Sequence, residues 1–467
     1  MNAFKLLIGG KLVDGDLSMD VVNPATGASF ARSPRASSAQ LNQAVAAARA
    51  AFPAWSRTPI TDRQHLLNAC ADAIDAHTEE LAKLLTQEQG KPLKDAAIEV
   101  MVTTYFMRYF ANLELPAQLR DGGPHASATL QRRPLGVVGA IIPWNFPLAI
   151  FAFKAPAALL AGNTLVVKPA PTTPLATLRL GEILKDVLPA GVLNIITDAN
   201  DLGAELTAHP DVRKISFTGS TTTGRKVMAN AANTLKRLTL ELGGNDAAIV
   251  LDDVDPKRVA PAIFEAAFQN SGQVCLALKR LYVHEKIYDS MCAELAKLAN
   301  AAVLGDGLQE GVTHGPLQNK QQYEKVKQIL ADAKLHGKII AGGEVLDRPG
   351  YFVMPTIVRD IAEGARLVDE EQFGPLLPII RFSDPEDALA RANACDAGLG
   401  GSVWSSDLKR AQELADRMEA GTVWINAHTG MSPGVPFGGA KQSGFGAEFG
   451  EEGLAEFTQL HAIYQAK

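Results

Sequence analysis

Three loops of the sequence carry residues that could perform acyl chemistry. Cys275 ends the segment NSGQVC, Glu241 begins ELGGN, and Asn145 lies between two prolines in PWNFP. A cysteine thiolate is a nucleophile, a carboxylate can act as a general base, and a side-chain amide can donate to a developing oxyanion. Each residue also has an ordinary interpretation: a cysteine packed in a core, a solvated glutamate, and an asparagine bonded to its own backbone.

A fourth loop could bind phosphate. The segment FTGSTTTG (217–224) follows an apolar run at 214–217 and precedes a helical pattern at 225–232. Glycine lets the backbone approach an anion, and the N-terminus of the following helix favours negative charge. The alternative is an ordinary turn between a strand and a helix with a Ser/Thr cap, because two glycines are weaker evidence than a full G-x-G-x-x-G.

The elements that must hold these loops alternate between strand and helix. Short β-branched runs separated by helical segments predict parallel strands joined by right-handed crossovers. These runs lie at 137–142, 164–167, 192–196 and 214–217. A second series starts near 247 and ends at about 425, so we expect an α/β protein with two doubly wound parallel sheets. Ligands of such sheets bind at the carboxyl ends of the strands, where the loops above lie.

The N-terminal quarter is predicted to be mainly helical. Helical periodicity over 40–51 follows Ser38, which can cap that helix, and it continues over 61–86 and 95–113. The segment 126–134 alternates as an exposed strand does.

Composition excludes several classes of protein. The chain has 467 residues, 47% hydrophobic and 21% charged, with a net charge of −6, so we expect roughly two to three domains and no nucleic-acid partner. Four scattered cysteines predict neither a disulfide framework nor a zinc site, which favours a reducing, cytoplasmic setting. Residues 1–10 lack the apolar core of a signal peptide, and the apolar stretch 147–167 contains Lys154 and Pro156. We therefore expect no membrane segment.

Taken together, the motifs resemble those of the NAD(P)-dependent aldehyde dehydrogenases, in the family's order and across nearly the whole chain. The matching motifs are Pro143-Trp144-Asn145-Phe146-Pro147, Val167-Lys168-Pro169, Phe217-Thr218-Gly219-Ser220-Thr221 with Gly224, Glu241-Leu242-Gly243-Gly244, Gly272-Gln273-Val274-Cys275, Glu370-Glu371-Gln372-Phe373-Gly374-Pro375, and Pro436-Phe437-Gly438-Gly439 with Lys441 and Ser443-Gly444.

The resemblance implies a catalytic role for each of the first three residues. Cys275 would attack the aldehyde carbon to give a thiohemiacetal, and Asn145 with the Cys275 backbone N–H would hold the oxyanion. After hydride transfer to the cofactor, Glu241 would activate the water that hydrolyses the thioester. The product is the carboxylic acid.

The resemblance also implies the cofactor contacts. Lys168 would bind the adenosine ribose, and Glu371 the nicotinamide ribose. The remaining contacts expected are Trp144 along the dinucleotide, Gly219, Ser220 and Gly224 at the pyrophosphate, and Phe373 beside the nicotinamide ring. Many members that prefer NAD have Glu three residues after the ribose lysine, where this chain has Pro171. We expect NAD, with NADP left open.

The family's domain plan predicts an NAD(P)-binding, Rossmann-like domain of residues 1–125 and 135–242 and a catalytic domain of residues 243–435. Strands at 126–134 and 450–466 would form a small β oligomerisation element, so we expect a homodimer or homotetramer.

The aldehyde itself is less constrained by the motifs. Succinate semialdehyde enzymes typically carry arginines at the positions of Phe153 and Gln269, and a buried carboxylate without a partner costs several kcal/mol. We therefore expect a neutral, apolar or aromatic aldehyde and no metal. Phe106, Tyr109 and Phe153 are predicted as apolar walls of the pocket and His428 as a polar contact, although core packing explains the aromatic residues equally well.

Three other readings remain at this point. A semialdehyde dehydrogenase of the CoA-acylating type would use the same cysteine but should lack the carboxylate at 241. A cysteine hydrolase would need no dinucleotide. A binding or structural protein would have a disabled site, whereas Cys275, Glu241 and Asn145 are all present.

Overall fold

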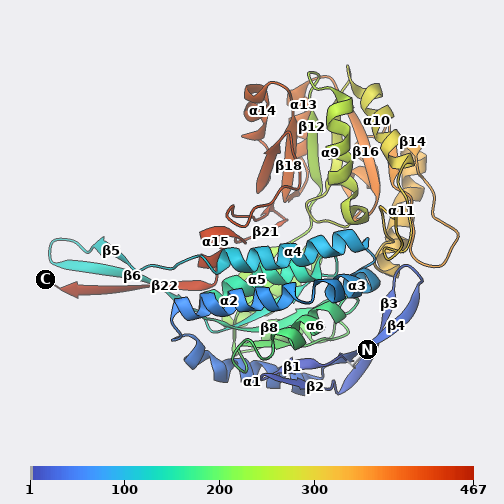
Figure 1. The fold of residues 1–467 in the computed structure, drawn as a ribbon. Helices are drawn as coiled ribbons and strands as arrows, with labels where there is room; N and C mark the ends of the chain where they lie inside the picture. The colour runs from blue at the N-terminus through green and yellow to red at the C-terminus, as the bar shows by residue number, and fades with distance from the viewer. Residues whose placement is uncertain (1–3, 467) are drawn as a thin grey trace.

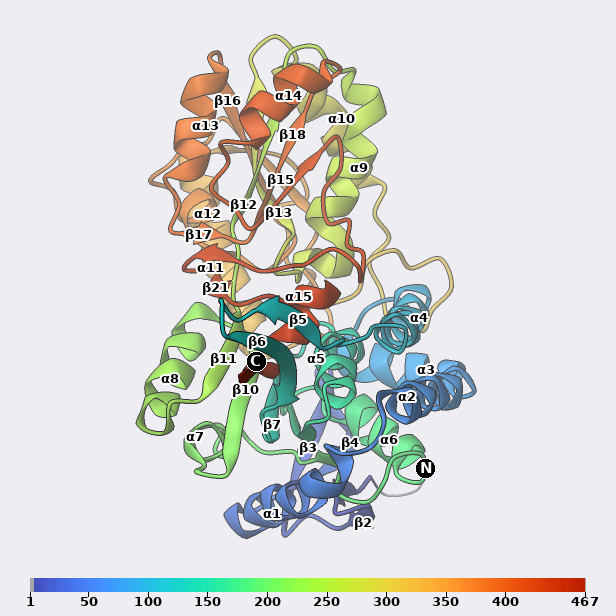
Figure 2. The same ribbon diagram turned by 90° about the vertical axis from the view of Figure 1, so that its left-hand side faces the viewer.

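The computed structural model describes residues 4–466; residues 1–3, which the predicted cofactor domain includes, lie outside it. Two α/β domains are stacked one above the other, and a long β element projects sideways from the lower one (Figure 1). Each domain contains a central sheet covered by helices on both faces (Figure 2). The predicted fold class is thereby confirmed. Within the described residues, no helix is both long and apolar enough to cross a membrane.

The lower domain is built on an eight-stranded sheet whose five middle strands are parallel. Its strand order is β2 (Lys11–Val13), β1 (Leu6–Ile8), β9 (Leu193–Ile195), β8 (Thr164–Pro169), β7 (Val137–Ile142), β10 (Val212–Thr218), β11 (Arg237–Glu241) and β21 (Gly444–Phe445). The middle strands read as continuous apolar runs because both of their faces are buried.

Helices cover both faces of this sheet. One face packs against α1 (Ser38–Trp55), α7 (Gly203–Ala208) and α8 (Thr221–Ala231), and the other against α5 (Pro147–Leu160) and α6 (Leu175–Leu184). A further layer on α5 and α6 is formed by α2 (Ile60–Asp75), α3 (Thr78–Gln89) and α4 (Leu93–Phe110). The predicted helical segment 61–86 is thus two helices, and α1 is capped by Ser37, not Ser38. Ser37 completes a capping box with Gln40.

The upper domain contains a seven-stranded sheet with six parallel strands. Its order is β14 (Lys338–Ala341), β15 (Thr356–Arg359), β16 (Leu376–Phe382), β13 (Leu278–His284), β12 (Asp246–Val250), β18 (Gly400–Trp404) and β19 (Thr422–Ile425). Helices α9 (Pro256–Phe268) and α10 (Tyr288–Asn300) form one apolar core with the sheet. On the other face lie α11 (Lys320–His336), α12 (Arg366–Asp369), α13 (Pro385–Asn393) and α14 (Leu408–Ala415).

The projecting element is a three-stranded antiparallel sheet of β5 (Gln118–Asp121), β6 (Ala126–Pro134) and β22 (Thr458–Ala466). Two-stranded pieces elsewhere are β3 (Leu17–Asn23) with β4 (Ala28–Arg35), and β17 (Ala397–Gly398) with β20 (Ala440–Lys441). The strand expected over 450–466 is wrong in its first part, because α15 (Gly450–Ala455) is a helix whose Glu451 and Glu452 complement its N-terminal dipole.

The chain crosses between the domains more often than the predicted ranges imply. After the upper domain, the segment around 444–457 returns to the lower one: β21 extends the lower sheet and α15 packs on α5. Strand β5, which the predicted ranges place in the cofactor domain, belongs to the projecting sheet.

Candidate active site

Cys275 lies just before β13, in a turn with an unusual backbone. The short 3-10 helix η2 (Gln269–Gly272) ends α9, and Asn270, Ser271 and Gly272 have φ values of 51°, 55° and 73°. A Cβ on Gly272 would lie 2.2 Å from the carbonyl oxygen of Gly374, so only glycine fits there. The turn leaves Cys275 half-buried, with its side chain in the walls of two cavities.

Asn145 follows the carboxyl end of β7 and is 3% exposed. Its Nδ2 donates to the carbonyl oxygen of Gln273 at 3.1 Å, two residues before the cysteine. Its own carbonyl oxygen accepts from Lys91 Nζ at 3.0 Å and from Asn270 Nδ2 at 3.1 Å. The alternative of an asparagine bonded to its own backbone is therefore wrong: the amide reaches across to the cysteine turn, and a side-chain amide has a second N–H to donate.

Glu241 is the last residue of β11 and is 4% exposed, so the alternative of a solvated carboxylate is also wrong. Neither of its carboxylate oxygens has a hydrogen-bond partner among residues 4–466. Burial raises the pKa of Glu241 well above its ordinary value; Glu448 raises it further and Lys154 opposes the shift. Lys154 and Glu448 are themselves a buried ion pair. A buried carboxyl of this kind suits a general base that operates near neutral pH.

The thiol of Cys275 is held in its neutral form. Burial is the main cause of its raised pKa, and the negative charges of Asp246, Glu241 and Glu371 add to it, while a backbone hydrogen bond from Leu276 opposes them. A thiolate at this position therefore requires transfer of the proton to a base. Glu241 lies in the wall of the same cavity.

The larger cavity is a cleft of about 860 Å³ between the two domains. Five predicted cofactor residues line it: Trp144, Gly219, Ser220, Glu371 and Phe373. Ser220 caps the N-terminus of α8, whose free N–H groups favour an anion. Glu371 Oε1 accepts from the backbone N–H of Gly244 at 3.1 Å, and burial raises the pKa of Glu371 to about 7, opposed by Lys325.

Two other predicted cofactor residues lie behind the cleft wall. Gly224 packs on Leu242, where an added Cβ would lie 2.5 Å from a leucine methyl. Lys168 is 4% exposed, and its Nζ forms an ion pair with Asp198 at 2.6 Å. Trp144 and Phe373 meet edge-on with 5.3 Å between their ring centroids. The cleft therefore offers a helix N-terminus at one end and a carboxylate beside an aromatic pair at the other.

The smaller cavity, of about 220 Å³, lies on the opposite side of Cys275 and is mainly apolar. Phe153 and Gln269 line it as predicted. Its other apolar wall residues, none of which was named individually from the sequence as a pocket residue, are Ile98, Val102, Phe146, Ala149, Ile150, Val274, Leu276, Met431, Phe437 and Phe449. The acidic side chains of Asp95 and Glu448 also reach this wall.

Three predicted pocket residues do not reach this cavity. Phe106 lies one layer behind, with its ring centroid 4.6 Å from that of Phe153. Tyr109 lies beside Gly434. His428 is buried and bonded on both nitrogens, to Ser402 Oγ at 2.9 Å and to the carbonyl oxygen of Leu276 at 3.1 Å. A histidine with both nitrogens engaged supports the loop after the cysteine and has none left for a substrate.

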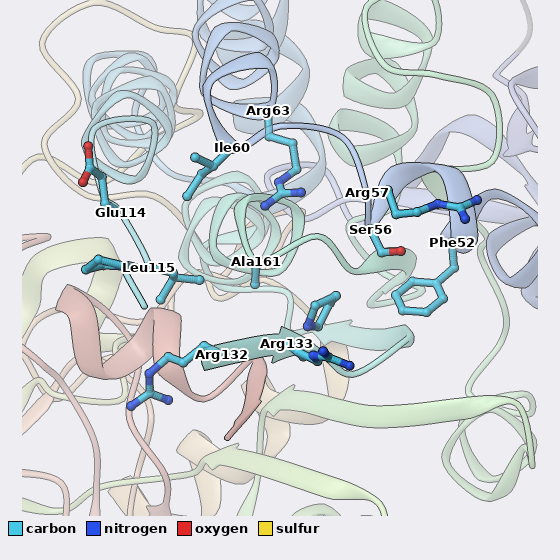
Figure 3. Close-up of a pocket in the computed structure, with 12 residues that line it drawn as sticks. Phe52, Ser56, Arg57, Ile60, Arg63, Glu114, Leu115, Arg132, Arg133 and Ala161 are labelled. Atoms are coloured by element: carbon cyan, nitrogen blue, oxygen red, sulfur yellow. The ribbon is translucent and has the colours of Figure 1, made fainter. Parts of the chain in front are cut away.

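A third cavity, of about 640 Å³, lies at the foot of the projecting element (Figure 3). Arg63 points from α2 toward Ala161, and Arg132 and Arg133 extend from β6. None of the three predicted catalytic residues is in its wall. Arg63 donates to the carbonyl oxygen of Leu160 at 2.9 Å, the last residue of α5, so this cation stabilises a helix end.

Fold and site together define a class of protein. Two doubly wound domains face a cleft with a helix N-terminus in its wall, as in dinucleotide-binding proteins. A cysteine and an amide line both this cleft and the smaller cavity, and a buried carboxyl lines the smaller cavity. This combination of fold and cleft is that of a dinucleotide-dependent oxidoreductase.

Comparison with known proteins agrees with that class. The model of the aldehyde dehydrogenase family matches residues 13–463, and the chain belongs to this family of oxidoreductases. It is 40% identical to phenylacetaldehyde dehydrogenase of Pseudomonas fluorescens over 98% of this chain and 95% of that one. It is 38% identical to an NADP-dependent succinate-semialdehyde dehydrogenase of Escherichia coli strain K12, covering 97% and 96%.

Solved structures show the same fold. A putative aldehyde dehydrogenase from Burkholderia cenocepacia superposes with a TM-score of 0.97 at 40% identity, covering 99% of this chain and 97% of that one. PnpE in complex with nicotinamide adenine dinucleotide gives a TM-score of 0.97 at 38% identity, covering 100% and 98%.

Proposed function

We propose that this aldehyde dehydrogenase oxidises a neutral, apolar or aromatic aldehyde to its carboxylic acid, with Cys275 as nucleophile and NAD as cofactor. The observation that carries the proposal is the position of Cys275, where the 860 Å³ cleft and the 220 Å³ pocket meet. An aldehyde in the pocket and a dinucleotide in the cleft would both reach the thiol.

The cleft fits a dinucleotide on several observations. The N-terminus of α8 at Ser220 suits a pyrophosphate, and the backbone at Gly243 passes so close to Glu371 that a Cβ would lie 2.4 Å from its carboxylate. Glu371 would bind a ribose hydroxyl, and Phe373 and Trp144 would pack along the ligand. Bound NAD would supply the acceptor for the hydride that leaves the aldehyde carbon.

The residues of the chain account for the other steps. The Cys275 thiol loses its proton to solvent, its sulfur bonds to the aldehyde carbon, and the oxyanion is held by the Asn145 amide and the Cys275 backbone N–H. Loss of hydride from this tetrahedral carbon leaves a thioester on Cys275. Glu241 then removes a proton from a water molecule, which attacks the thioester. The C–S bond breaks, the acid is released, and Glu241 returns the proton to the Cys275 sulfur.

The pocket wall supports the neutral substrate. Gln269 and Phe153 are uncharged, and the Lys91 ammonium is already paired with Glu99. Asp95 brings further negative charge to the same wall, whereas Glu448 is already paired with Lys154. A carboxylate on the substrate would be buried in this wall without a cation of its own, at a cost of several kcal/mol.

The charges of the residues expected near the adenosine favour NAD over NADP. Lys168 is already paired with Asp198, so its charge is not free for a 2′-phosphate, and Pro171 adds no cation to the cleft wall. The chain's four cysteines are free thiols, which suits the cytoplasm as its location.

The projecting element supports assembly into a dimer or tetramer. Leu119 and Tyr464 are 77% and 69% exposed on its strands, and Leu460 and Ile463 are exposed beside them. Large apolar side chains gathered on a thin sheet commonly mark an interface between subunits. Light scattering coupled to size exclusion tests this assembly, and a monomeric mass at micromolar concentration contradicts it.

Formation of NADH tests the proposed reaction directly. Absorbance at 340 nm should rise when phenylacetaldehyde is added with NAD and rise much less with NADP. Hydrolysis of esters with no reduction of either cofactor would identify a cysteine hydrolase instead.

A further inference from the structure

Two loops meet behind Cys275: one leads to the proposed nucleophile, and the other carries proposed cofactor contacts. The turn of residues 270–272 leads into Cys275 and is called the cysteine turn here. The loop of residues 371–374 carries Glu371 and Phe373, the proposed contacts of the nicotinamide end, and is called the cofactor loop. They touch through their backbones, since a Cβ on Gly272 would lie 2.2 Å from the Gly374 carbonyl oxygen. The distance between the thiol and the cofactor depends on this contact.

Lys279 bonds to both loops at once. It lies near the start of β13 and is 1% exposed. Its Nζ donates to the carbonyl oxygen of Gly272 at 2.7 Å and to that of Gly374 at 3.0 Å. One ammonium group therefore joins the cysteine turn to the cofactor loop.

The environment of Lys279 differs from that of the other buried lysines. Lys91, Lys154, Lys168 and Lys214 each have a carboxylate within ion-pair distance. Over residues 4–466, Lys279 has none. Burying an ammonium without a counter-ion is costly, and an apolar side chain would fill the space without that cost. This cost in stability suggests that the protein needs the two hydrogen bonds from Lys279 to the carbonyl oxygens.

Charges around Lys279 come from three further elements. Burial lowers its pKa to about 7, Glu371 on the cofactor loop and Asp246 on β12 oppose the shift, and Lys325 on α11 adds to it. Lys325 Nζ donates to the carbonyl oxygen of Glu371 at 2.6 Å, so the cofactor loop is held from α11 as well. The cysteine turn is also held by two other contacts: Asn270 Nδ2 donates to the carbonyl oxygen of Asn145 at 3.1 Å, and Ser271 Oγ donates to that of Gly315 at 2.8 Å.

We propose that Lys279 is a positioning residue that sets the distance between the Cys275 turn and the Glu371–Gly374 loop, and so aligns the substrate carbon with the cofactor for hydride transfer. This inference rests on the proposed dehydrogenase function. Lys279 touches neither substrate nor cofactor. A misplacement of about 1 Å between reacting groups costs on the order of 10²-fold in rate.

The experiment compares two activities of one cysteine. Aldehyde oxidation requires both loops, whereas hydrolysis of p-nitrophenyl acetate without cofactor requires the cysteine turn alone. Lys279→Met should lower single-turnover NADH formation by about 10- to 100-fold and change esterase kcat by less than about threefold. The KM for aldehyde should stay within about threefold, because the pocket on the far side of Cys275 is untouched.

Arg280→Met is the matched control. Arg280 is the next residue of β13, it is buried, and it also donates to carbonyl oxygens, those of Asn245 at 2.8 Å and Ala392 at 3.0 Å. These carbonyls belong to neither loop. The control should keep the wild-type ratio of oxidation to esterase activity even if it lowers the melting temperature.

Equal losses of both activities in Lys279→Met, or no loss of NADH formation, would overturn the proposal. If the methionine variant does not fold, Lys279→Gln, whose shorter amide can reach one carbonyl, should give a smaller but still selective loss of oxidation. A wild-type protein that hydrolyses the ester but never reduces NAD would refute the proposed function itself. That result differs from the two variant outcomes that would overturn only the role of Lys279.

Discussion

The two cavities that meet at Cys275 are built from different material. The cleft of about 860 Å³ is lined by loops at strand ends, with glycines and a capped helix, and by polar side chains of α11. The pocket of about 220 Å³ is lined by side chains of α4, α5 and the C-terminal segment, most of them apolar. Loops and polar groups line one cavity, and mainly apolar side chains line the other. We therefore expect cofactor binding to depend on loops common to the fold, and substrate choice on individual side chains.

Removing the thiol should have the largest effect, because it lies where the two cavities join. Cys275→Ala should lower kcat/KM for aldehyde oxidation by on the order of 10⁴-fold or more, since no covalent intermediate can form. NAD should still bind, as followed by quenching of protein fluorescence. Cys395→Ala, a change at a half-buried thiol outside both cavity walls, is the control and should keep wild-type activity.

Glu241 belongs to the pocket side but serves the water that completes the reaction. Glu241→Gln should slow thioester hydrolysis by about 10²- to 10⁴-fold and hydride transfer much less, seen as a burst of NADH followed by a slow steady state.

The pH dependence follows from the raised pKa of Glu241. The carboxylate is the active form, so the wild-type hydrolysis rate should rise with pH through that raised pKa, and the glutamine variant should lose this rise. An unchanged profile in Glu241→Gln would remove Glu241 as the base.

Asn145 lines both cavities and should show an intermediate effect. Asn145→Ala removes one oxyanion donor and should lower kcat by about 10²- to 10³-fold. Lys91→Met, which removes the bond to the Asn145 carbonyl, should act through the same loop. In the double variant the losses should be less than multiplicative, and fully multiplicative losses would show that Lys91 acts elsewhere.

A change on the pocket side alone should alter substrate choice. Gln269→Arg places a cation in the pocket wall, so the ratio of kcat/KM for succinate semialdehyde to that for phenylacetaldehyde should rise by about 10- to 100-fold. The KM for NAD should not change, because Gln269 is in the wall of the pocket and not of the cleft. An equal change for both aldehydes would contradict the division between the two cavities.

A change on the cleft side alone should have the smallest effect. Pro171→Glu places a carboxylate near the expected adenosine ribose, where it should repel a 2′-phosphate and raise the preference for NAD over NADP by about tenfold, or about 1.4 kcal/mol. Aldehyde specificity should stay the same. A lower preference for NAD would show that Pro171 is not near the ribose.

The fold and the cleft could be predicted from sequence further than the pocket could. Parallel strands bring their carboxyl ends to one edge, so Asn145, Gly219 and Glu241 were placed correctly from their positions after apolar runs. The pocket depends on the rotation of α4 and on the return of the chain near residue 449. Helical spacing alone cannot separate Ile98, which lines the pocket, from Phe106, which lies behind it.

The contacts of Lys154, Glu448 and Lys279 could not be predicted from the sequence either. Each joins segments that are distant along the chain or depends on the exact path of a loop: Lys154 meets Glu448 across 294 residues, and Lys279 reaches Gly374 across 95. The position of Lys154 within an apolar stretch was the only signal in the sequence, and it did not identify Glu448 as the partner.

The central claim is that one thiol uses both cavities at once. Rapid quenching of Glu241→Gln with phenylacetaldehyde and NAD, followed by mass spectrometry of peptides, measures this directly. A phenylacetyl thioester on Cys275 should accumulate only when aldehyde and NAD are both present. An acyl adduct that forms without NAD, or one on another residue, would contradict it.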